Sequence, residues 1–354
     1  MSVFSFDVIP KSFVGIDIGT SALKVVEIKG WGDRKTLKNY GELRIRTLYD
    51  KPFRTFEKNA LLLSSQDIAK AIRAVLQEAH IREKKVIFSI PDFSSFFTTF
   101  ELPSSMDRKE VEDAVRFEAR RHVPLLLSEV TLDWQLLEQP SKGKKQPFRI
   151  LLVAVPNETL NQYQEIARFA QLQLVALEAE VFGCIRACLK EEKAAVVLLD
   201  MGAQTTTISV VHNGILQNSH SMDAGGMSFT ERIAKALSVN YRIAEQEQNS
   251  KGIALVSGNV QILLPVADMV VSEAQKAAES FARTEKGKVN KFVLAGGMAR
   301  LPGLQEYFER STGTKTEIID PWRSILYPPI LESALQDMGP SFAVAVGMAL
   351  KGFE

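Results

Sequence analysis

The sequence predicts an α/β protein built from two copies of one domain, with an anion-binding cleft between the copies. Residues 14–28 and 197–211 share one pattern: an apolar strand, then Asp-x-Gly, then hydroxyl residues, then a second apolar strand. A third run, 291–295, is strand-like and ends in Gly296-Gly297. One Asp-x-Gly turn is ordinary hairpin chemistry, but two copies followed by a strand with paired glycines favour a common ligand.

The bulk composition is that of a soluble globular protein with two domains or more. The 354 residues are 45% hydrophobic and 24% charged, which is ordinary for a globular chain, and one average domain is shorter. The formal net charge is +1, from 43 basic and 42 acidic residues. Nucleic-acid binding needs a basic excess to displace counterions, so the balance argues against a nucleic-acid partner.

The sequence also predicts a cytoplasmic location. No apolar run reaches the ~20 residues that span a bilayer, and residues 1–10 lack the features of a secretory signal. Cys184 and Cys188 lie four apart in a helical pattern, which favours small core residues over a disulfide. We expect contact with a membrane to be peripheral, and the apolar residues of the first ten positions to pack on the protein as a short arm.

The first part of the chain is expected to form a β-β-β-α-β unit. Two strands joined by Gly19-Thr20-Ser21 come first, followed by a strand over 38–46. A helix over 64–80 has its apolar residues on one face and begins with the capping pair Ser64 and Asp67. A β-branched strand over 85–90 then ends at Pro91.

A small α+β insert is expected next, because the segment interrupts the main pattern and carries no phosphate motif. Strands are expected over 93–102, 130–137 and 148–155, and helices over 107–122 and 157–171. The lysine-containing segment 139–147 is expected to be a solvated loop.

The remainder is expected to repeat the first plan. A strand over 172–178 and a helix over 181–189 lead to the second hairpin. Gly225-Gly226 opens a helix expected over 228–237, where Glu231 follows three residues after Ser228, the spacing of a capping pair. Helices alternate to about residue 284, and others are expected over 302–312 and, after Pro340, over 341–351.

The first hairpin turn carries the residues that a phosphate site needs. Successive N–H groups of such a turn can point at one anion, and Gly19 allows close approach while Thr20 and Ser21 add hydroxyl donors. Asp17 repels phosphate, so its expected partner is Mg²⁺ held through water. Lys24 supplies a cation that can neutralise phosphate charge.

The second hairpin repeats this chemistry. Asp200 takes the place of Asp17 as the second carboxylate on the Mg²⁺ side, and Gly202, Thr205 and Thr206 are expected to hold phosphate. The chain has neither the Walker lysine motif nor a Gly-x-Gly-x-x-Gly fingerprint, which excludes a P-loop or Rossmann site.

The three motifs in this order resemble the phosphate 1, phosphate 2 and adenosine segments of the actin, Hsp70 and sugar-kinase superfamily. A finer resemblance covers nearly the whole chain and is to the PilM family of type IV pilus assembly, with the division protein FtsA as a cousin. The segments that carry it are 15–24, Leu102-Pro103 with Met106, 118–124, 132–134, 151–156, 175–182, 200–206, Gly225-Gly226 and 294–304. The resemblance implies an actin-like ATPase fold of duplicated ribonuclease-H-like domains with an FtsA-type 1C insert.

The resemblance also implies a division into subdomains. The expected divisions are 11–91 for the first part of subdomain 1A, 92–171 for the 1C insert, 172–195 for the second part of 1A, 196–225 for the first part of 2A, 226–289 for 2B, 290–330 for the second part of 2A, and 331–354 for a closing helix of 1A.

ATP with Mg²⁺ is the implied ligand of the cleft, with slow hydrolysis or none. Its implied binding residues are Asp17, Gly19, Thr20, Ser21 and Lys24 on one side, Asp200, Gly202, Thr205 and Thr206 on the other, and Gly226, Gly296 and Gly297 beside ribose and adenine. Asp17 and Asp200 are the implied metal and catalytic carboxylates. Glu180 is the implied catalytic residue that orients an attacking water; the other interpretation is a helix N-terminal acid that complements the helix dipole.

Two positions depart from the pattern of the relatives. Gln248 stands where a lysine is common on the helix that flanks adenine, and Met298 stands where a third glycine is common after Gly296-Gly297. Both departures concern the adenine end of the cleft rather than the phosphates.

The implied partner is the N-terminal cytoplasmic tail of a PilN-like single-span inner-membrane protein, bound between subdomains 1A and 1C. Phe96, Phe97 and Phe100 are candidates for that groove, although alternating strand phenylalanines are more often core. Contacts with pilus motor ATPases and self-association are further implied possibilities, and the membrane is reached only through the partner. The implied location is cytoplasmic, peripheral at the inner membrane.

Three alternative functions each have their own sequence requirements. A division-type homologue that polymerises on the membrane should carry an amphipathic helix after a linker, and the sequence ends soon after its last expected helix. A sugar kinase should present a catalytic carboxylate to a substrate lobe, and none stands out in the insert. The cytoplasmic part of the type II secretion L protein has a similar fold but continues into a membrane span.

Overall fold

The computed structural model describes residues 10–44, 56, 57, 60, 61, 63–103, 105, 106, 108–138, 147–258, 260–285 and 287–354. The expected apolar arm and all but the last residue of the expected loop over 139–147 lie outside these ranges. No helix among the described residues is both long enough and apolar enough to cross a membrane.

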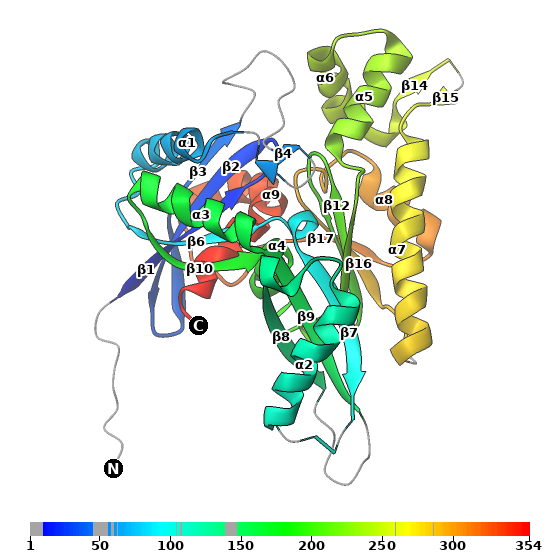
Figure 1. Ribbon diagram of the computed structural model, residues 1–354. Helices are drawn as coiled ribbons and strands as arrows, with labels where there is room; N and C mark the ends of the chain where they lie inside the picture. The colour runs from blue at the N-terminus through cyan, green and yellow to red at the C-terminus, as the bar shows by residue number, and fades with distance from the viewer. Residues whose placement is uncertain are drawn as a thin grey trace.

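Two five-stranded sheets with the same topology form the centre of the molecule (Figure 1). The first has the order β10-β6-β1-β2-β3, and the second has the order β13-β12-β11-β16-β17. In each, three consecutive strands form an antiparallel meander and two later strands join parallel to its first strand. The strands are β1 (Lys11–Ile18), β2 (Ala22–Trp31), β3 (Arg34–Arg44), β6 (Lys85–Ile90), β10 (Gln173–Ala179), β11 (Val196–Met201), β12 (Thr206–His212), β13 (Ile215–Met222), β16 (Lys291–Ala295) and β17 (Thr316–Ile318). The matching order confirms the duplicated α/β fold.

Helices cover both faces of each sheet and create the layers. Helices α1 (Ser65–Glu78) and α3 (Asn157–Ala170) pack on the outer face of the first sheet. Helix α4 (Glu180–Cys184), its π-helical continuation Ile185–Leu189, and α9 (Glu332–Lys351) contribute to a core shared by the two sheets. The outer face of the second sheet is covered by α5 (Gly226–Leu237), α7 (Leu264–Glu285) and α8 (Leu304–Thr312). This arrangement leaves the two hairpin turns facing one another across the α4–α9 layer.

The insert is a three-stranded sheet of order β7-β9-β8, covered on one face by α2 (Arg108–His122). Its strands are β7 (Phe96–Leu102), β8 (Val130–Glu138) and β9 (Phe148–Pro156). Residues Phe100, Val115 and Ile150 belong to its own core, whereas Leu151 and Val153 join the central core that both large sheets share. The insert is therefore packed against the body of the protein and does not hang from it by a linker.

Smaller elements complete the described chain: β4 (Phe56–Glu57), β5 (Ala60–Leu61), α6 (Tyr241–Lys251), β14 (Val256–Ser257), β15 (Val260–Gln261) and the 3₁₀ turns Asp92–Ser94, Leu127–Glu129, Gly252–Ala254 and Pro329–Leu331. Helix α6 packs beside α5 at the end of the molecule that also carries β14 and β15 (Figure 1).

Two predicted helix starts are wrong. Helix α5 begins at Gly226 and its cap is Gly225, so Ser228 lies inside the helix and makes no cap. Helix α9 begins at Glu332 and contains Pro340. A proline removes one helical hydrogen bond, and the carbonyl that this frees, on Gln336, accepts a hydrogen bond from the Arg300 side chain instead.

Strand β13 and the short β17 have no counterpart among the predicted elements. The predicted capping pair at α1 is confirmed, because the Ser64 side chain accepts a hydrogen bond from the backbone N–H of Asp67 at 3.1 Å.

Candidate functional site

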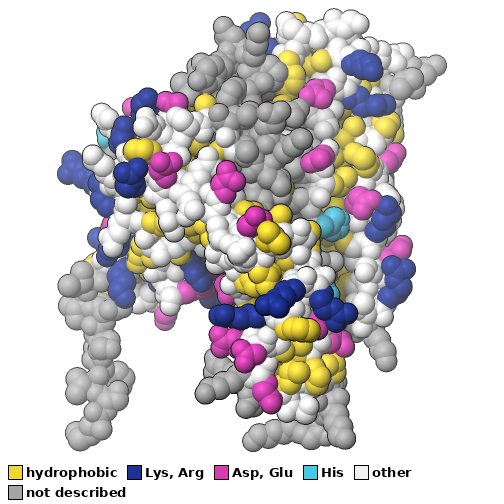
Figure 2. Space-filling model, viewed as in Figure 1, with side chains coloured by type: hydrophobic (Ala, Val, Ile, Leu, Met, Phe, Trp, Pro, Cys, Tyr) yellow, Lys and Arg dark blue, Asp and Glu magenta, His cyan; other side chains and the backbone are white. Residues whose placement is uncertain are grey.

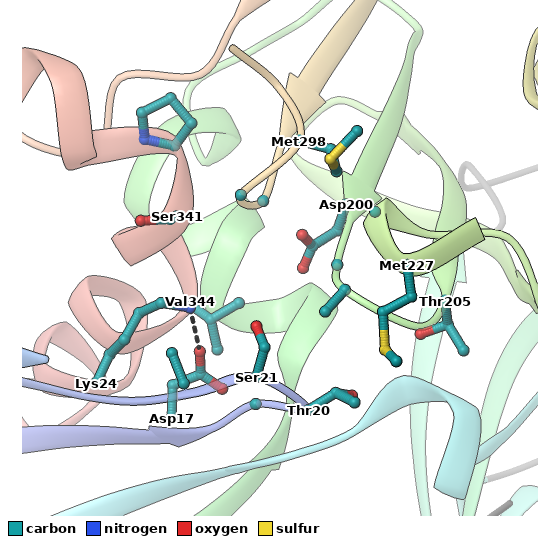
Figure 3. A pocket seen from close by; sticks show the side chains of 18 of the residues that line it. Asp17, Thr20, Ser21, Lys24, Asp200, Thr205, Met227, Met298, Ser341 and Val344 are labelled. Atoms are coloured by element: carbon teal, nitrogen blue, oxygen red, sulfur yellow. Dashed lines mark hydrogen bonds and ion pairs between the residues drawn. The ribbon is translucent and has the colours of Figure 1, made fainter. Parts of the chain in front are cut away.

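A cleft of about 420 Å³ lies between the two hairpin turns (Figure 3). Every site residue predicted from the sequence except Thr206 lines it, namely Asp17, Gly19, Thr20, Ser21, Lys24, Glu180, Asp200, Gly202, Thr205, Gly226, Gly296 and Gly297. In Figure 3 the side chains of Asp17 and Ser21 from one hairpin and Asp200 from the other point toward the space between them. Residues that are far apart in sequence thus meet at one cavity.

The two hairpin turns have the same internal geometry. In the first, the N–H of Gly19 donates to the carbonyl of Ala22 at 3.0 Å; in the second, the N–H of Gly202 donates to the carbonyl of Thr205 at 2.9 Å. A Cβ on Gly19 would lie only 3.0 Å from the Ala22 carbonyl oxygen, so the tight turn favours glycine. The shared turn supports the interpretation of both motifs as copies of one device.

The side chain of Thr206 does not face the cleft. It is fully buried and its hydroxyl donates to the carbonyl of Ala224. Thr207 lines the cleft instead, because it pairs with Asp200 just as Lys24 pairs with Asp17. Successive strand residues point to opposite faces. Thr207 therefore occupies the position in the second hairpin that is equivalent to Lys24 in the first.

Asp17 and Asp200 form an acidic pair across the cleft. Asp17 is 4% exposed, accepts a hydrogen bond from the Ser89 hydroxyl at 2.9 Å, and its Oδ2 lies 3.5 Å from Lys24 Nζ. Burial raises the pKa of Asp200 to about 6, and the charge of Asp17 adds to the rise while Lys24 opposes it. Because burial and the charge of Asp17 disfavour the ionised form of Asp200, a cation placed between the two carboxylates would be bound favourably.

Among the described residues there is no group of three or more His, Cys, Asp or Glu side chains that could hold a metal ion. Magnesium differs from zinc in this respect, since it keeps several waters and uses one or two carboxylates together with phosphate oxygens. The pair of Asp17 and Asp200 fits that requirement.

Glu180 is held by a reciprocal contact with Asp92, a residue that the sequence analysis did not single out. The N–H of Asp92 donates to Glu180 Oε2 at 3.3 Å, and the N–H of Val181 donates to Asp92 Oδ1 at 3.2 Å. Burial is the first cause that raises the pKa of Glu180 well above its usual value, followed by the charges of Asp17, Asp92 and Asp200. The buried and acidic surroundings of Glu180 therefore favour the protonated form of its carboxyl.

Asp92→Asn is expected to flatten the pH dependence of stability. Burial raises the pKa of Asp92 to about 8, so the folded protein keeps a proton that the unfolded chain releases from about pH 4 upward. Stability is lost as pH rises through this window, by at most ~1.4 kcal/mol per pH unit for one proton. Asparagine mimics the protonated side chain and keeps an acceptor for Val181.

The measurement is urea unfolding of both proteins at pH 5, 6, 7 and 8. We expect similar stability at pH 5 and a growing advantage of the variant toward pH 8. Asp67→Asn is the control, because the pKa of the exposed Asp67 is lowered by Lys70 and Ser64, and its carboxylate stays charged from pH 5 to 8. Parallel curves for wild type and Asp92→Asn would show that Asp92 carries no proton.

The opposite end of the cleft is shaped by glycine backbone. Gly296 has φ +81°, and a Cβ there would lie 2.4 Å from the carbonyl oxygen of Met201, so this strand end tolerates glycine alone. A Cβ on Gly226 would lie 2.9 Å from Met298 Sδ. The glycines at this end are therefore required by close packing of the protein against itself at Gly296 and Gly226.

Several further residues line the cleft without having been predicted as site residues: Thr207, Met227, Thr230, Tyr241, Arg300, Pro340, Ser341 and Val344. Strand alternation could have identified Thr207. The residues of α9 carried no signal, since only the packing of that helix between the sheets brings them to the cleft.

This fold and this cleft define a class of protein. Solved structures of similar fold include the ethanolamine utilization protein EutJ from Carboxydothermus hydrogenoformans (TM-score 0.58, 13% identity, 97% of this chain and 90% of that one) and MreB5 of Spiroplasma citri bound to ADP (TM-score 0.54, 14% identity, 97% and 96%). The chain has the actin-like ATPase fold.

The family within that class follows from a closer match. The sequence profile of the family described as type IV pilus assembly protein PilM matches residues 15–353, and the chain belongs to this family. The solved structure of a PilM-PilN type IV pilus biogenesis complex is similar with a TM-score of 0.83 and 26% identity, over 96% of this chain and 98% of that one. The cell division protein FtsA of Streptococcus pneumoniae serotype 2 (strain D39) is 24% identical over 353 residues, covering 87% of this chain and 75% of FtsA.

Proposed function

We propose that this protein is an ATP-binding scaffold of the inner-membrane platform that assembles type IV pili or a related secretion machine. In this proposal it docks the N-terminal cytoplasmic tail of a PilN-like single-span protein. The carrying observation is the family match over residues 15–353 together with the similarity to a PilM-PilN complex. Contact with the membrane then comes through the partner, which makes the protein cytoplasmic and peripheral.

The cleft is proposed to bind ATP with Mg²⁺. Backbone N–H groups and hydroxyls of the two hairpin turns would hold the phosphates, and Lys24 would neutralise part of their charge. Asp17 and Asp200 would hold waters of the metal, and the ion would neutralise charge on the phosphates. The support is the facing geometry of the two turns and the acidic pair between them.

Slow hydrolysis, or none, is proposed for this cleft. A carboxyl that orients or activates water acts best with a pKa near the working pH, and Glu180 is buried among three other acids that raise its pKa. A bound cation would offset those charges. Glu180 therefore has the place of a water-orienting residue but a protonation state that depends on what the cleft holds.

The partner tail is proposed to bind at the insert, where apolar side chains reach the surface. Phe117, Leu125 and Leu126 are 62%, 45% and 67% exposed, and Figure 2 shows hydrophobic side chains exposed on the visible face of the insert close to Lys and Arg. The strand phenylalanines are less available: Phe100 is buried and stacks on His122, and Phe97 packs against Phe182. A disordered tail that folds on binding needs such apolar anchors.

The test is a calorimetric titration of the protein, with and without Mg·ATP, against a peptide that copies the cytoplasmic tail of the PilN-like protein of the same organism. Saturable binding that a scrambled peptide lacks is the expected result. An affinity that changes with ATP would show coupling between the two sites, which must be reciprocal. Absence of binding in both states would overturn the docking proposal.

Contacts with motor ATPases and self-association are proposals for the assembled platform.

A further inference from the structure

Three side chains at the glycine-rich end of the cleft form one buried hydrogen-bonded unit. Thr230 of α5, Gln248 of α6 and Met298 of the loop after β16 are 2%, 3% and 7% exposed, and all three line the cleft. Gln248 Oε1 lies 2.5 Å from Thr230 Oγ1, and Gln248 Nε2 lies 3.1 Å from Met298 Sδ. Gln248 therefore contacts both Thr230 and Met298.

The chemistry of Met298 fixes which way the Gln248 amide points. A thioether sulfur has no proton and can only accept a hydrogen bond, so the NH₂ end of the amide must face it. If the amide were reversed, Oε1 would face Sδ, and two acceptors would meet at about the same separation. With the NH₂ end at Met298, the carbonyl end faces Thr230 and accepts its hydroxyl proton.

The Thr230 hydroxyl would otherwise leave this choice open. Its Oγ1 also lies 3.0 Å from the carbonyl oxygen of Gly226, and a hydroxyl has only one proton to donate. If that proton went to Gly226, Thr230 could accept from a reversed amide. Met298 removes this alternative, because only the orientation with NH₂ toward Met298 and the carbonyl toward Thr230 gives the Gln248 amide a hydrogen bond to both residues.

We propose that Met298 holds the Gln248 amide so that its second N–H is presented to the nucleoside part of a bound nucleotide, which makes Gln248 a specificity-determining donor. In the described part of the chain, Met298 Sδ is the acceptor found for Gln248 Nε2, and an NH₂ group has two protons. A base nitrogen or a ribose oxygen is the class of acceptor that fits. The inference rests on the proposed nucleotide function of the cleft.

A neutral donor at this place distinguishes a nucleotide from a bare polyphosphate without adding charge. In the proposed function, Lys24 and the turn N–H groups at the other end of the cleft would recognise any polyphosphate with a metal ion. One neutral hydrogen bond contributes ~0.5–1.5 kcal/mol net, so we expect its loss to weaken nucleotide binding about 3- to 10-fold.

The experiment compares the dissociation constants of Mg·ATP and Mg·tripolyphosphate, measured by calorimetry on the full chain. Gln248→Leu is expected to weaken Mg·ATP binding about 3- to 10-fold and to leave tripolyphosphate binding unchanged. Met298→Leu conserves volume but frees the amide to turn, so a smaller loss for Mg·ATP is expected. In the Gln248→Leu background, Met298→Leu should have no further effect, since the coupling acts through the amide.

Met227→Leu is the matched control, because Met227 also lines the cleft and the described structure shows no hydrogen bond from Gln248 to it. Repeating the Gln248→Leu titration with 2′-deoxy-ATP separates the two acceptors: an effect that disappears assigns a ribose oxygen, and one that persists assigns the base or another ribose position.

Other outcomes would overturn the inference. Equal weakening of Mg·ATP and tripolyphosphate binding by Gln248→Leu would show a structural role only, and unchanged Mg·ATP binding would show no contact. Additive effects of the two substitutions would exclude the orientation mechanism. A wild-type protein that binds tripolyphosphate and Mg·ATP equally would also overturn it, whereas binding of neither would remove the nucleotide function itself.

Discussion

Asp200→Asn is expected to weaken Mg·ATP binding by about 10- to 100-fold, the range found when residues that hold a metal through its outer shell are changed. Asparagine has the same shape but lacks the charge that attracts a hydrated cation. Asp200 stands at the end of β11, opposite Asp17, where burial and the neighbouring carboxylate already raise its pKa to about 6. Because the Asp200 carboxylate is poorly solvated, it should interact strongly with a bound cation, and removal of its charge should weaken cation binding strongly.

Without Mg²⁺, Asp200→Asn should no longer weaken ATP binding. In EDTA, ATP brings negative charge toward Asp17 and Asp200, and removal of one carboxylate lowers that repulsion. Metal-free ATP should therefore bind Asp200→Asn as tightly as the wild type, or more tightly. A defect in folding would weaken binding under both conditions, so the reversal identifies a metal role.

Glu42→Gln is the matched control for charge. Glu42 also lines the cleft, but it belongs to β3 and lies near Arg44, with Glu42 Oε2 3.3 Å from Arg44 Nε. The substitution removes the same charge from the wall and should leave the Mg²⁺ dependence of ATP binding intact. If Asp200→Asn retained the wild-type response to Mg²⁺, the assignment of Asp200 to the metal would be wrong.

The two hairpin turns that line the cleft are predictable from the sequence because local pattern determines them. A hairpin forms from an apolar strand, a tight turn with glycine and a second strand, whatever surrounds them. Two such hairpins indicate a duplicated sheet. The one error there, Thr206 for Thr207, came from choosing hydroxyl residues by proximity in sequence. Pairing Asp200 with its cross-strand partner, as Asp17 pairs with Lys24, would have selected Thr207.

The remainder of the site depends on packing that no local pattern encodes. Asp92 follows a strand and reads as a turn residue, yet the structure brings it to the start of α4, where it binds Val181 and Glu180. The local pattern predicts a helix start after Pro340, whereas in the structure Pro340 lies inside α9 and the Arg300 side chain binds the carbonyl of Gln336 that the proline leaves free. Contacts between segments far apart in sequence decide both cases.

Gly347→Ala is expected to destabilise the protein by about 3 kcal/mol, at the upper end of the cost of overpacking. A Cβ on Gly347 would lie 1.9 Å from the carbonyl oxygen of Gly183, where α9 crosses α4. The obstacle is backbone, so no side-chain rotation can relieve it, and the helices must separate. The gain in helix propensity, ~1 kcal/mol for Gly to Ala, is too small to offset the clash.

The same separation should reach the cleft. Helix α4 begins with Glu180 and ends with Cys184, whose Sγ lies 4.0 Å from Asp200 Oδ2. Movement of α4 away from α9 would therefore displace both Glu180, which lines the cleft, and Cys184, which lies beside Asp200. We expect Gly347→Ala to weaken Mg·ATP binding as well as stability, although residue 347 does not line the cavity.

Thermal and urea unfolding, followed by a Mg·ATP titration of the folded variant, test both parts. Gly297→Ala is the control for the general effect of replacing glycine, since a Cβ there meets nothing within 4 Å, and its stability should stay close to that of the wild type. If Gly347→Ala were as stable as the wild type, α4 and α9 would have to cross at a greater distance than the one described here, with room for a Cβ between Gly347 and the Gly183 carbonyl. Lower stability with unchanged Mg·ATP affinity would mean that α4 does not transmit the displacement to Glu180 and Asp200.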